Sequence, residues 1–402
     1  MKTALVHPFG NPNAYHAALA LDEQGWLEQF HTCLFNPWNS GRRWFPQLCG
    51  ARVHRHQAFE WLRLAATKLP AGPWNGRSPQ FVDRAGTWCD GRSSRGLTAA
   101  LDAVYCYEDF ALASFRQARR LGVRCVYDLP TCYYKAAHSA LAAEVEREPA
   151  LRLFVYELRE PAEKLIRKEE EIGLATQIVC ASSFTRQTIP TGIRDRTPVT
   201  VIPYGADTAR PCRTWTPEDF RGKLKLIFAG SLGPRKGIHV LFEALHGLSP
   251  RSYELSLAGR WVPGFEAFLN SKFSVNYKFL GRLRGFELTE AYLRSHLLVF
   301  PSLADGFGLV LLEAMACGIP VVTTERTGGP DLLQQGGGYL VKAGDADALR
   351  ARIEEIMCSR RDLPEVSSAA RRVAEQHSWQ RYRAELVAAL HAAAITAESP
   401  TR

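Results

Sequence analysis

FPSLADGFGLVLLEAMACGIPVV occupies residues 300–322 and holds, in order, the end of an apolar strand, a glycine-rich turn, a helix and the start of another strand. Gly306 and Gly308 leave backbone N–H groups uncovered where the helix begins. Such donors and the helix dipole together favour a phosphate or diphosphate. Asp305 lies in the turn and Glu313 lies inside the helix. The Asp305 carboxylate can therefore face a ligand beyond the start of the helix, while the Glu313 carboxylate binds the same ligand from the side. The alternative is a buried helix cap with a solvated glutamate.

The same alternation of short apolar runs and amphipathic stretches continues along most of the chain, which predicts buried parallel strands joined by helices. The predicted strands are Thr3–His7, Ala103–Tyr107, Arg124–Tyr127, Gln177–Cys180, Val199–Ile202, Lys225–Ala229, Glu254–Ala258, Asn276–Leu280, Leu297–Phe300, Pro320–Thr323 and Gly338–Val341. The predicted helices include Phe110–Leu121, a long charged one near Leu151–Gly173, Lys236–Leu245, Leu309–Ala316 and Asp347–Met357. This order predicts an α/β protein made of two successive doubly wound units.

A linker composition separates the two units. Ile202-Pro203-Tyr204-Gly205-Ala206-Asp207 ends a strand, and a polar stretch with Pro211 and Pro217 follows before Lys223 starts a new strand. We therefore expect a first domain over residues 1–205 and a second domain over residues 206–379.

The charge of the chain favours an anionic partner. It has 402 residues, 50 of them Lys or Arg and 41 Asp or Glu, which gives a net charge of +9. Residues 51–100 hold eight basic and three acidic residues and so contribute +5. A nucleotide, a phosphorylated sugar, a nucleic acid or an acidic lipid would suit this excess.

The apolar runs and the cysteine spacing indicate where the protein is located and whether its cysteines are reduced. No apolar run approaches the ~20 residues of a membrane-spanning helix, and none near the N-terminus has the length of a signal peptide. We therefore expect the protein to stay in the compartment where it is made, the cytoplasm. The ten cysteines form no CxxC pair, which favours buried free thiols over a metal site or a disulfide set.

A second glycine-rich loop, IFAGSLGPRKGI at residues 227–238, also joins a strand to a helix. Arg235 offers a planar fork and Lys236 a point charge, and both suit phosphate oxygens. Two cations at a helix start are unfavourable for the dipole unless an anion neutralises them. The alternative is a solvated surface pair.

Together these segments resemble the second domain of GT-B-fold glycosyltransferases of the large retaining family 4, also called glycosyl transferases group 1. Gly230 through Gly237 is similar to the family's donor-phosphate loop, and Asp305 through Glu313 is similar to its E-x7-E motif, with Asp305 replacing the first Glu. Residues 202–207 resemble the interdomain NGVD stretch, with Tyr204 where Asn is usual, and residues 377–382 resemble the F-S-W segment. The motifs span residues 200–385, whereas residues 1–200 match only in outline.

The resemblance implies two Rossmann-like domains facing across a cleft, with a last helix at about 380–402 packing back on the first domain. It also assigns roles in binding a nucleotide-sugar. Glu313 would hold the ribose hydroxyls, Asp305 would contact the transferred sugar, and Arg235 and Lys236 would neutralise the leaving diphosphate. The donor-binding set is completed by Gly230, Ser231, Arg260, Gly306, Phe307, Gly308 and Leu309. The base would stack near Arg260 and residues 281–283.

The first domain is expected to supply the acceptor side. Gly10 and Asn11 follow the first strand, where a loop in the family contacts the donor, and a plain turn is the alternative. Asp128 follows another strand, and ligands bind at such strand ends in open α/β sheets. We expect Asp128 in the cleft, with a role as general base left open against front-face transfer, in which the leaving phosphate is the base.

The basic segment 51–100 contains a helical pattern in which Phe59, Leu62 and Ala66 share a face between cations. This pattern fits either an ordinary amphipathic surface helix or peripheral contact with an anionic membrane on its inner face.

These features predict a retaining hexosyltransferase that moves a sugar from a UDP- or GDP-sugar to a hydroxyl of a saccharide, lipid-linked or small-molecule acceptor. No metal or other cofactor is expected, because the family relies on cations at the phosphates and no DxD motif is evident. No nucleic-acid partner is expected, because no such motif is visible. The alternatives are a GT-B-fold sugar-nucleotide epimerase, a phosphorylase, or a non-catalytic nucleotide-sugar-binding paralogue.

Overall fold

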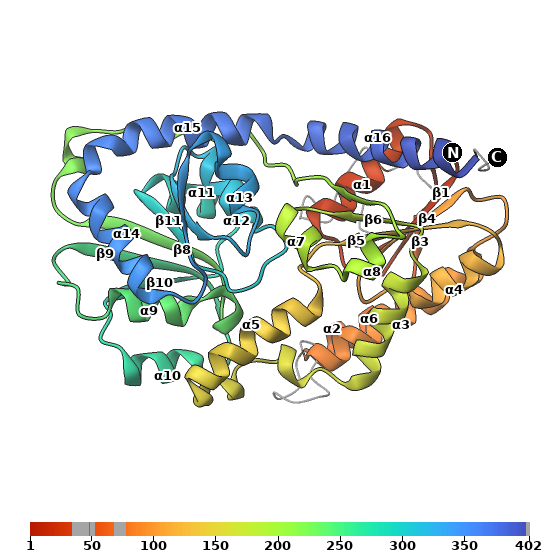
Figure 1. Ribbon diagram of the computed structural model, residues 1–402, viewed down its shortest axis with the longest axis horizontal. Coiled ribbons are helices and arrows are strands. Elements are labelled where there is room, and N and C mark those ends of the chain that lie inside the picture. Colours follow the sequence, from red (N-terminus) through yellow and green to blue (C-terminus); the bar gives the residue numbers. More distant parts are fainter. Residues whose placement is uncertain (34–47, 49–52, 68–77, 399–402) are drawn as a thin grey trace.

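The computed structural model describes residues 1–33, 48, 53–67 and 78–398 of the chain. Two lobes lie side by side, each built on a parallel sheet with helices on both faces (Figure 1). The predicted fold class, two doubly wound Rossmann-like units, is therefore confirmed.

The first lobe is a seven-stranded sheet with the order β3-β2-β1-β4-β5-β6-β7. Its strands are β1 Thr3–Val6, β2 Leu27–Thr32, β3 Val53–Arg55, β4 Ala103–Tyr107, β5 Arg124–Leu129, β6 Gln177–Cys180 and β7 Val199–Val201. Its helices are α1 Pro12–Glu23, α2 Ala58–Ala66, α3 Pro79–Ser93, α4 Leu112–Arg120, α5 Tyr134–Arg147, α6 Ala162–Leu174, α7 Ser183–Thr188 and α8 Thr191–Arg194. Strands β2 and β3 were not predicted, because the sequence of β2, LEQFHT, is half polar.

The second lobe is a six-stranded sheet with the order β10-β9-β8-β11-β12-β13. Its strands are β8 Leu224–Leu232, β9 Tyr253–Trp261, β10 Tyr277–Gly281, β11 Leu297–Phe300, β12 Val321–Thr324 and β13 Gly338–Val341. Its helices are α9 Ile238–Leu245, α10 Phe265–Lys272, α11 Phe286–Leu293, α12 Leu309–Ala316, α13 Gly329–Leu332, α14 Ala346–Cys358 and α15 Leu363–Gln376. The last helix, α16 Trp379–Glu398, runs along the top of Figure 1 and packs on α1 of the first lobe.

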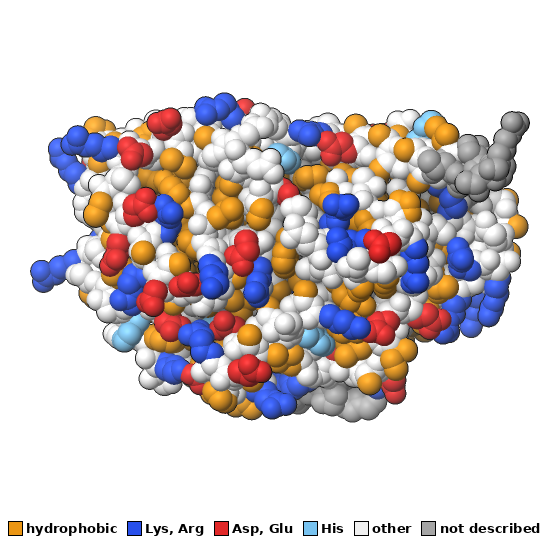
Figure 2. Space-filling view, in the orientation of Figure 1, with side chains coloured by type: hydrophobic (Ala, Val, Ile, Leu, Met, Phe, Trp, Pro, Cys, Tyr) orange, Lys and Arg blue, Asp and Glu red, His pale blue; other side chains and the backbone are white. Residues whose placement is uncertain are grey.

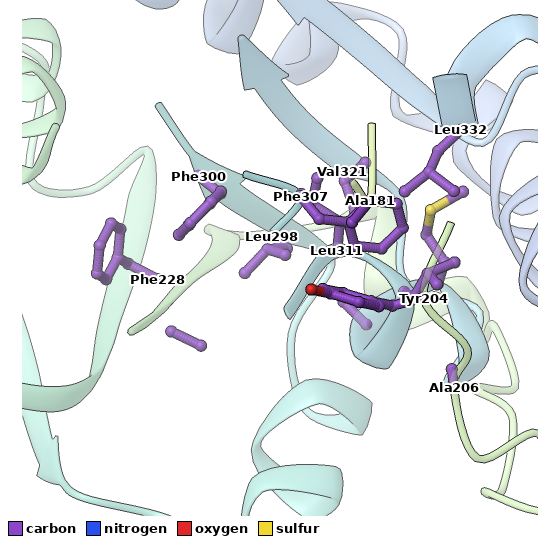
Figure 3. Packing of buried hydrophobic residues seen from close by; sticks show 14 of the residues in the cluster. Ala181, Tyr204, Ala206, Phe228, Leu298, Phe300, Phe307, Leu311, Val321 and Leu332 are labelled. Carbon is purple, nitrogen blue, oxygen red and sulfur yellow. The ribbon is translucent and has the colours of Figure 1, made fainter. Parts of the chain in front are cut away.

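The hydrophobic core is continuous from one lobe to the other. Ala181, at the end of β6, and Tyr204, in the linker, belong to the same buried cluster as Phe307, Leu311 and Leu332 of the second lobe. Figure 3 shows the Tyr204 ring lying among these side chains. Burial of this apolar surface stabilises the contact between the lobes.

A segment of the first lobe also reaches across to the second. Helix α5 and the 3₁₀ turns that follow it, Pro149–Leu153 and Glu157–Arg159, extend below the second lobe in Figure 1. The Phe154 ring packs against Phe265 and Phe268 of α10, at centroid distances of 4.9 and 5.3 Å. The prediction of one charged helix over 151–173 was wrong, since α6 begins only after Pro161 and a residue that precedes a proline avoids the helical conformation.

The predicted apolar face of α2 was correct for Phe59, whose ring lies 5.5 Å from Phe81 and 6.1 Å from Trp88 of α3, but wrong for Leu62. Glu60 is the fully buried residue of this helix and pairs with Arg63 at 2.5 Å, so the inward face includes a charged pair. Trp61 and Leu62 are instead 58% and 60% exposed. Residues 51–52 and 68–77 of the predicted basic segment lie outside the described residues.

Acidic and basic side chains are intermixed over the face drawn in Figure 2. Among the described residues, no helix combines the length and the apolar composition needed to cross a bilayer. The described cysteines are all free thiols, and most are buried as expected, but Cys212 and Cys358 are exposed. No cluster of His, Cys, Asp or Glu within the described ranges is arranged to hold a metal ion.

Candidate active site

Two adjoining cavities lie where the carboxyl ends of the second sheet face the first lobe. The larger has a volume of about 660 Å³ and contains Glu313 on one wall. Strand ends, the linker and the start of α16 surround it: Pro12, Gly205, Ala206, Asp207, Arg210, Ala229, Gly230, Ser231, Ala258, Gly259, Arg260, Arg282, Leu283, Gly285, Leu288, Leu309, Val310 and Trp379. Its position at strand ends is the usual one for a nucleotide in an α/β fold.

The smaller cavity has a volume of about 240 Å³ and contains Lys236 and Asp305. Its other lining residues are Pro130, Tyr204, Ala229, Gly230, Phe300, Phe307, Gly308, Leu309 and Val310. The two cavities share four residues, Ala229, Gly230, Leu309 and Val310, so they meet at the start of α12.

The start of α12 is formed by the glycine-rich turn. Gly308 is its N-cap residue and has a φ of 81°, a left-handed conformation that side chains other than glycine rarely adopt. The first amides of a helix have no acceptor within the helix, and the dipole adds partial positive charge there. The junction of the two cavities is therefore suited to a diphosphate.

Lys236 and Asp305 form a buried ion pair in the smaller cavity. Burial alone would raise the pKa of Asp305, but Lys236 and Arg235 hold it below its usual value. Burial lowers the pKa of Lys236, and Asp305 opposes that effect. The pair places one cation and one carboxylate beside the start of α12.

Close packing of two loops fixes this pair. Gly237 has a φ of 71°, and a Cβ there would lie 1.8 Å from the carbonyl oxygen of Pro301. The Arg235 carbonyl accepts hydrogen bonds from the Leu303 amide at 3.0 Å and from the Ser302 hydroxyl at 3.1 Å. The loop that carries Lys236 is thus tied to the loop that carries Asp305.

Arg235 lies close enough to Asp305 to lower the pKa of that carboxyl, and it has a second carboxylate partner. It lines neither cavity, and its Nε lies 3.1 Å from a carboxylate oxygen of Glu157, in the segment that crosses from the first lobe. The sequence placed Arg235 and Lys236 together at a diphosphate. Lys236 lines the smaller cavity, whereas Arg235 lines neither cavity but acts on Asp305, which does. The physical reason is the 3₁₀ turn Pro234–Lys236, which sends consecutive side chains in different directions.

The first lobe holds the turn that contains Gly306. The Gly306 carbonyl accepts hydrogen bonds from the hydroxyl groups of Ser182 and Thr185, the latter at 3.0 Å. A Cβ on Gly306 would lie 2.0 Å from the carbonyl oxygen of Pro130. The two lobes therefore touch directly at the turn that starts α12.

Asp128 was expected in the cleft, and the structure places it in the core instead. Strand β5 continues to Leu129, so Asp128 is paired with Tyr107 on one side and Val179 on the other. Its side chain is buried and accepts a hydrogen bond of 2.6 Å from the Tyr105 hydroxyl. Burial raises the pKa of Asp128 to about 7, and the Tyr105 hydroxyl opposes that shift. Asp128 lines neither cavity.

This burial predicts a pH-dependent cost to stability. The folded protein keeps a proton on Asp128 that the unfolded chain releases near its ordinary pKa of 3.8, so the free energy of unfolding falls as the pH rises from about 4 to about 7. Asp128→Asn removes this cost. The difference in the free energy of unfolding between the variant and the original protein should grow by roughly 3 kcal/mol from pH 5 to pH 8, measured by denaturant unfolding. Identical pH slopes for the two proteins would contradict the assignment.

Most of the remaining predicted residues line one or both cavities. Gly230, Ser231, Arg260, Leu309 and Glu313 line the larger, and Phe307 and Gly308 line the smaller. Gly10 and Asn11 line neither cavity, although Pro12, the next residue, lines the larger one. Gly10 packs against the Tyr15 side chain instead, since a Cβ on Gly10 would lie 2.3 Å from the Tyr15 hydroxyl oxygen.

Two features of the site were not predicted. Arg210 lies in the linker, where its surroundings in the sequence give no hint of a role. Ser182 and Thr185 are small polar residues at the start of α7, with the ordinary pattern of a helix cap.

Comparison with known proteins identifies the second lobe. Residues 217–373 match the family model described as Glycosyl transferases group 1, which confirms the resemblance drawn from the motifs. Sulfoquinovosyl transferase SQD2 of Arabidopsis thaliana is 29% identical over 159 residues, 39% of this chain and 31% of that protein. D-inositol 3-phosphate glycosyltransferase of Geodermatophilus obscurus is 30% identical over 271 residues, 58% of this chain and 56% of that protein. The chain thus spans from under a third to a little over half of these relatives.

Solved structures match over almost the whole chain. Sucrose-phosphate synthase of Thermosynechococcus elongatus aligns with a TM-score of 0.72 at 17% identity, covering 99% of this chain and 100% of that one. Anabaena HepE, solved in complex with UDP and glucose, aligns with a TM-score of 0.63 at 17% identity, covering 98% of this chain and 100% of that one. The fold is GT-B.

Proposed function

We propose, from the premise that residues 217–373 are a glycosyl transferases group 1 domain in a GT-B fold, that this protein transfers a sugar from a nucleotide-diphosphate-sugar to an acceptor hydroxyl with retention of configuration. One observation carries the proposal. The two cavities meet at the start of α12, with Glu313 in the larger and the Lys236–Asp305 pair in the smaller.

The nucleotide-sugar fits the two cavities in one orientation, with the nucleoside in the larger cavity and the sugar in the smaller. The nucleoside occupies the larger cavity, where Glu313 accepts hydrogen bonds from ribose hydroxyls and the base lies near Arg260 and residues 281–283. The diphosphate spans the junction over the first amides of α12. The sugar lies in the smaller cavity beside Asp305. The complex of HepE with UDP and glucose supports this donor class, and we propose UDP- or GDP-sugars.

The chemistry follows from these positions. The bond between the anomeric carbon and the diphosphate oxygen breaks, and the negative charge that develops is stabilised by Lys236 and the α12 amides. The acceptor oxygen attacks from the same face, and its proton passes to the leaving phosphate oxygen. This route assigns no proton transfer to the buried Asp128. We propose that it needs no metal, so EDTA should leave the rate unchanged.

A donor panel tests the proposal. The protein is incubated with UDP-, GDP- and ADP-sugars and a mixture of saccharide and lipid-linked acceptors, and products are analysed by mass spectrometry and by NMR of the anomeric centre. We expect a glycosylated product with the donor's anomeric configuration. Inversion would reject the retaining mechanism, whereas release of free nucleotide or dependence on phosphate, without an acceptor, would favour an epimerase or a phosphorylase. Nucleotide binding without turnover would favour a non-catalytic paralogue.

We further propose that the protein acts in the cytoplasm and that α2 contacts an anionic membrane. Trp61 and Leu62 are adjacent, large, apolar and exposed, and they lie in the most basic part of the sequence. Flotation with vesicles should show binding that depends on anionic lipid and is lost in a Trp61→Ser/Leu62→Ser double variant. Equal flotation of the variant would reject this contact.

A further inference from the structure

Arg210 lies on the wall of the larger cavity, in the linker between the lobes. The backbone at Arg210 and before it is already secured. Arg371 of α15 donates hydrogen bonds to the carbonyl oxygens of Thr208, at 2.7 Å, and of Arg210, at 3.0 Å. Further back, the Ala206 amide donates to the His377 carbonyl at 2.9 Å. The linker therefore holds the Arg210 side chain at a fixed place.

The guanidinium of Arg210 reaches towards Glu313. Its Nη2 lies 3.5 Å from a carboxylate oxygen of Glu313, and the two side chains are 16% and 26% exposed. The pair joins the linker to the middle of α12. The buried Tyr292 lies close enough that both charges act on its hydroxyl. Arg210 thus lies beside the carboxylate that is proposed to hold the ribose, and both side chains line the larger cavity.

A structural tie alone does not account for this arginine. Among the described residues its buried Nη1 has no hydrogen-bond acceptor of good geometry, and the other side chain that the guanidinium contacts is the Cys317 thiol, whose sulfur is a weak acceptor. The linker does not need the side chain as a staple, because Arg371 and the pairing of Ala206 with Ser378 already fix it. An apolar side chain would fill the same space without leaving a buried donor unpaired. What Arg210 adds is a directed positive charge beside Glu313.

We propose that Arg210 is a positioning residue for Glu313, which holds the carboxylate in the orientation that binds both ribose hydroxyls and so sets the preference for ribonucleotides over 2′-deoxyribonucleotides. This inference rests on the proposed function, since it assumes that a nucleoside occupies the larger cavity. A glutamate side chain has several rotatable bonds, and a carboxylate accepts from two adjacent hydroxyls only in a narrow range of orientations. If Arg210 already fixes the Glu313 carboxylate in the free protein, less conformational entropy of that side chain is lost when the nucleotide binds.

Calorimetry with UDP and 2′-deoxy-UDP, and with GDP and 2′-deoxy-GDP, tests the inference on the full chain. The original protein should prefer the better ribonucleotide over its deoxy form by roughly 10- to 100-fold, as expected for one hydrogen bond to a charged group. Arg210→Met should weaken the ribonucleotide by about 10-fold or more but the deoxy form much less, so that the ratio falls to within a few-fold. Arg210→Lys keeps the positive charge but lacks the planar guanidinium, so it should restore part of the ratio of ribonucleotide to 2′-deoxyribonucleotide affinity.

The matched control is Arg221→Met, a change at an exposed arginine of the same linker, and it should leave both affinities unchanged. An unchanged ratio in Arg210→Met, together with lost binding in Glu313→Ala, would overturn the inference and leave the nucleotide site standing. Failure of the original protein to bind any of the four nucleotides would overturn the nucleotide site itself, and the inference with it. If Arg210→Met does not fold, the ratio of ribonucleotide to 2′-deoxyribonucleotide affinity is compared between Arg210→Lys and Arg210→Gln instead.

Discussion

Glu313→Ala is expected to reduce transfer by at least about 100-fold while the protein still folds. Glu313 is 26% exposed on the cavity wall, so its loss removes no core packing. In the proposed complex it accepts hydrogen bonds from two ribose hydroxyls, and a hydrogen bond to a charged group contributes about 1.5–3 kcal/mol. The loss of two such bonds corresponds to roughly 3 kcal/mol or more, which is over 100-fold in kcat/KM.

The measurement is kcat/KM with the donor found in the panel, together with calorimetry for the free nucleotide. Glu354→Ala, at an exposed position on α14, is the matched control and should behave as the original protein does. Circular dichroism should be the same for all three proteins, and Glu313→Ala should still unfold cooperatively, with a lower midpoint only to the extent that the pair with Arg210 is lost. Near-normal turnover of Glu313→Ala with every nucleotide-sugar would reject the donor site and with it the proposed function.

Gly306→Ala is expected to reduce turnover by roughly 100-fold with little effect on nucleotide affinity. The added Cβ would lie 2.0 Å from the Pro130 carbonyl oxygen and 2.6 Å from the Thr131 Cα, both backbone atoms of the other lobe. The lobes must then separate, and a displacement of about 1 Å between reacting groups costs about 100-fold in rate. Gly306 does not line the larger cavity, so the nucleoside should still bind.

Separate measurement of kcat and of the nucleotide Kd checks this split. Gly91→Ala in α3 is the matched control, because a Cβ there meets no atom within 4 Å. It should leave both quantities unchanged. A parallel loss of nucleotide affinity in Gly306→Ala would mean that the donor loop itself is distorted, and unchanged turnover would mean that the contact between the lobes is not part of the catalytic arrangement.

The sequence alone determined the architecture and the backbone frame of the candidate site. Alternating apolar runs and helices are local patterns, and they predicted two doubly wound units correctly because parallel strands must be buried on both faces. The turn at residues 305–308 and the spacing of Glu313 along one helix are also local, so α12 begins and ends at the predicted residues. The distance between the start of a helix and a carboxylate on the same helix stays the same wherever the helix packs.

The tertiary structure decided which side chains reach the site. Asp128 looked like a loop residue in the cleft, but two more residues of strand turned its side chain into the core. Arg235 and Lys236 both act on Asp305, and the structure adds a contact between Arg235 and Glu157 of the other lobe that the sequence did not predict. Arg210 approaches Glu313, and Ser182 approaches Gly306, across more than one hundred residues of chain. Such contacts depend on how the lobes pack and on strand register, and neither is encoded in a short stretch of sequence.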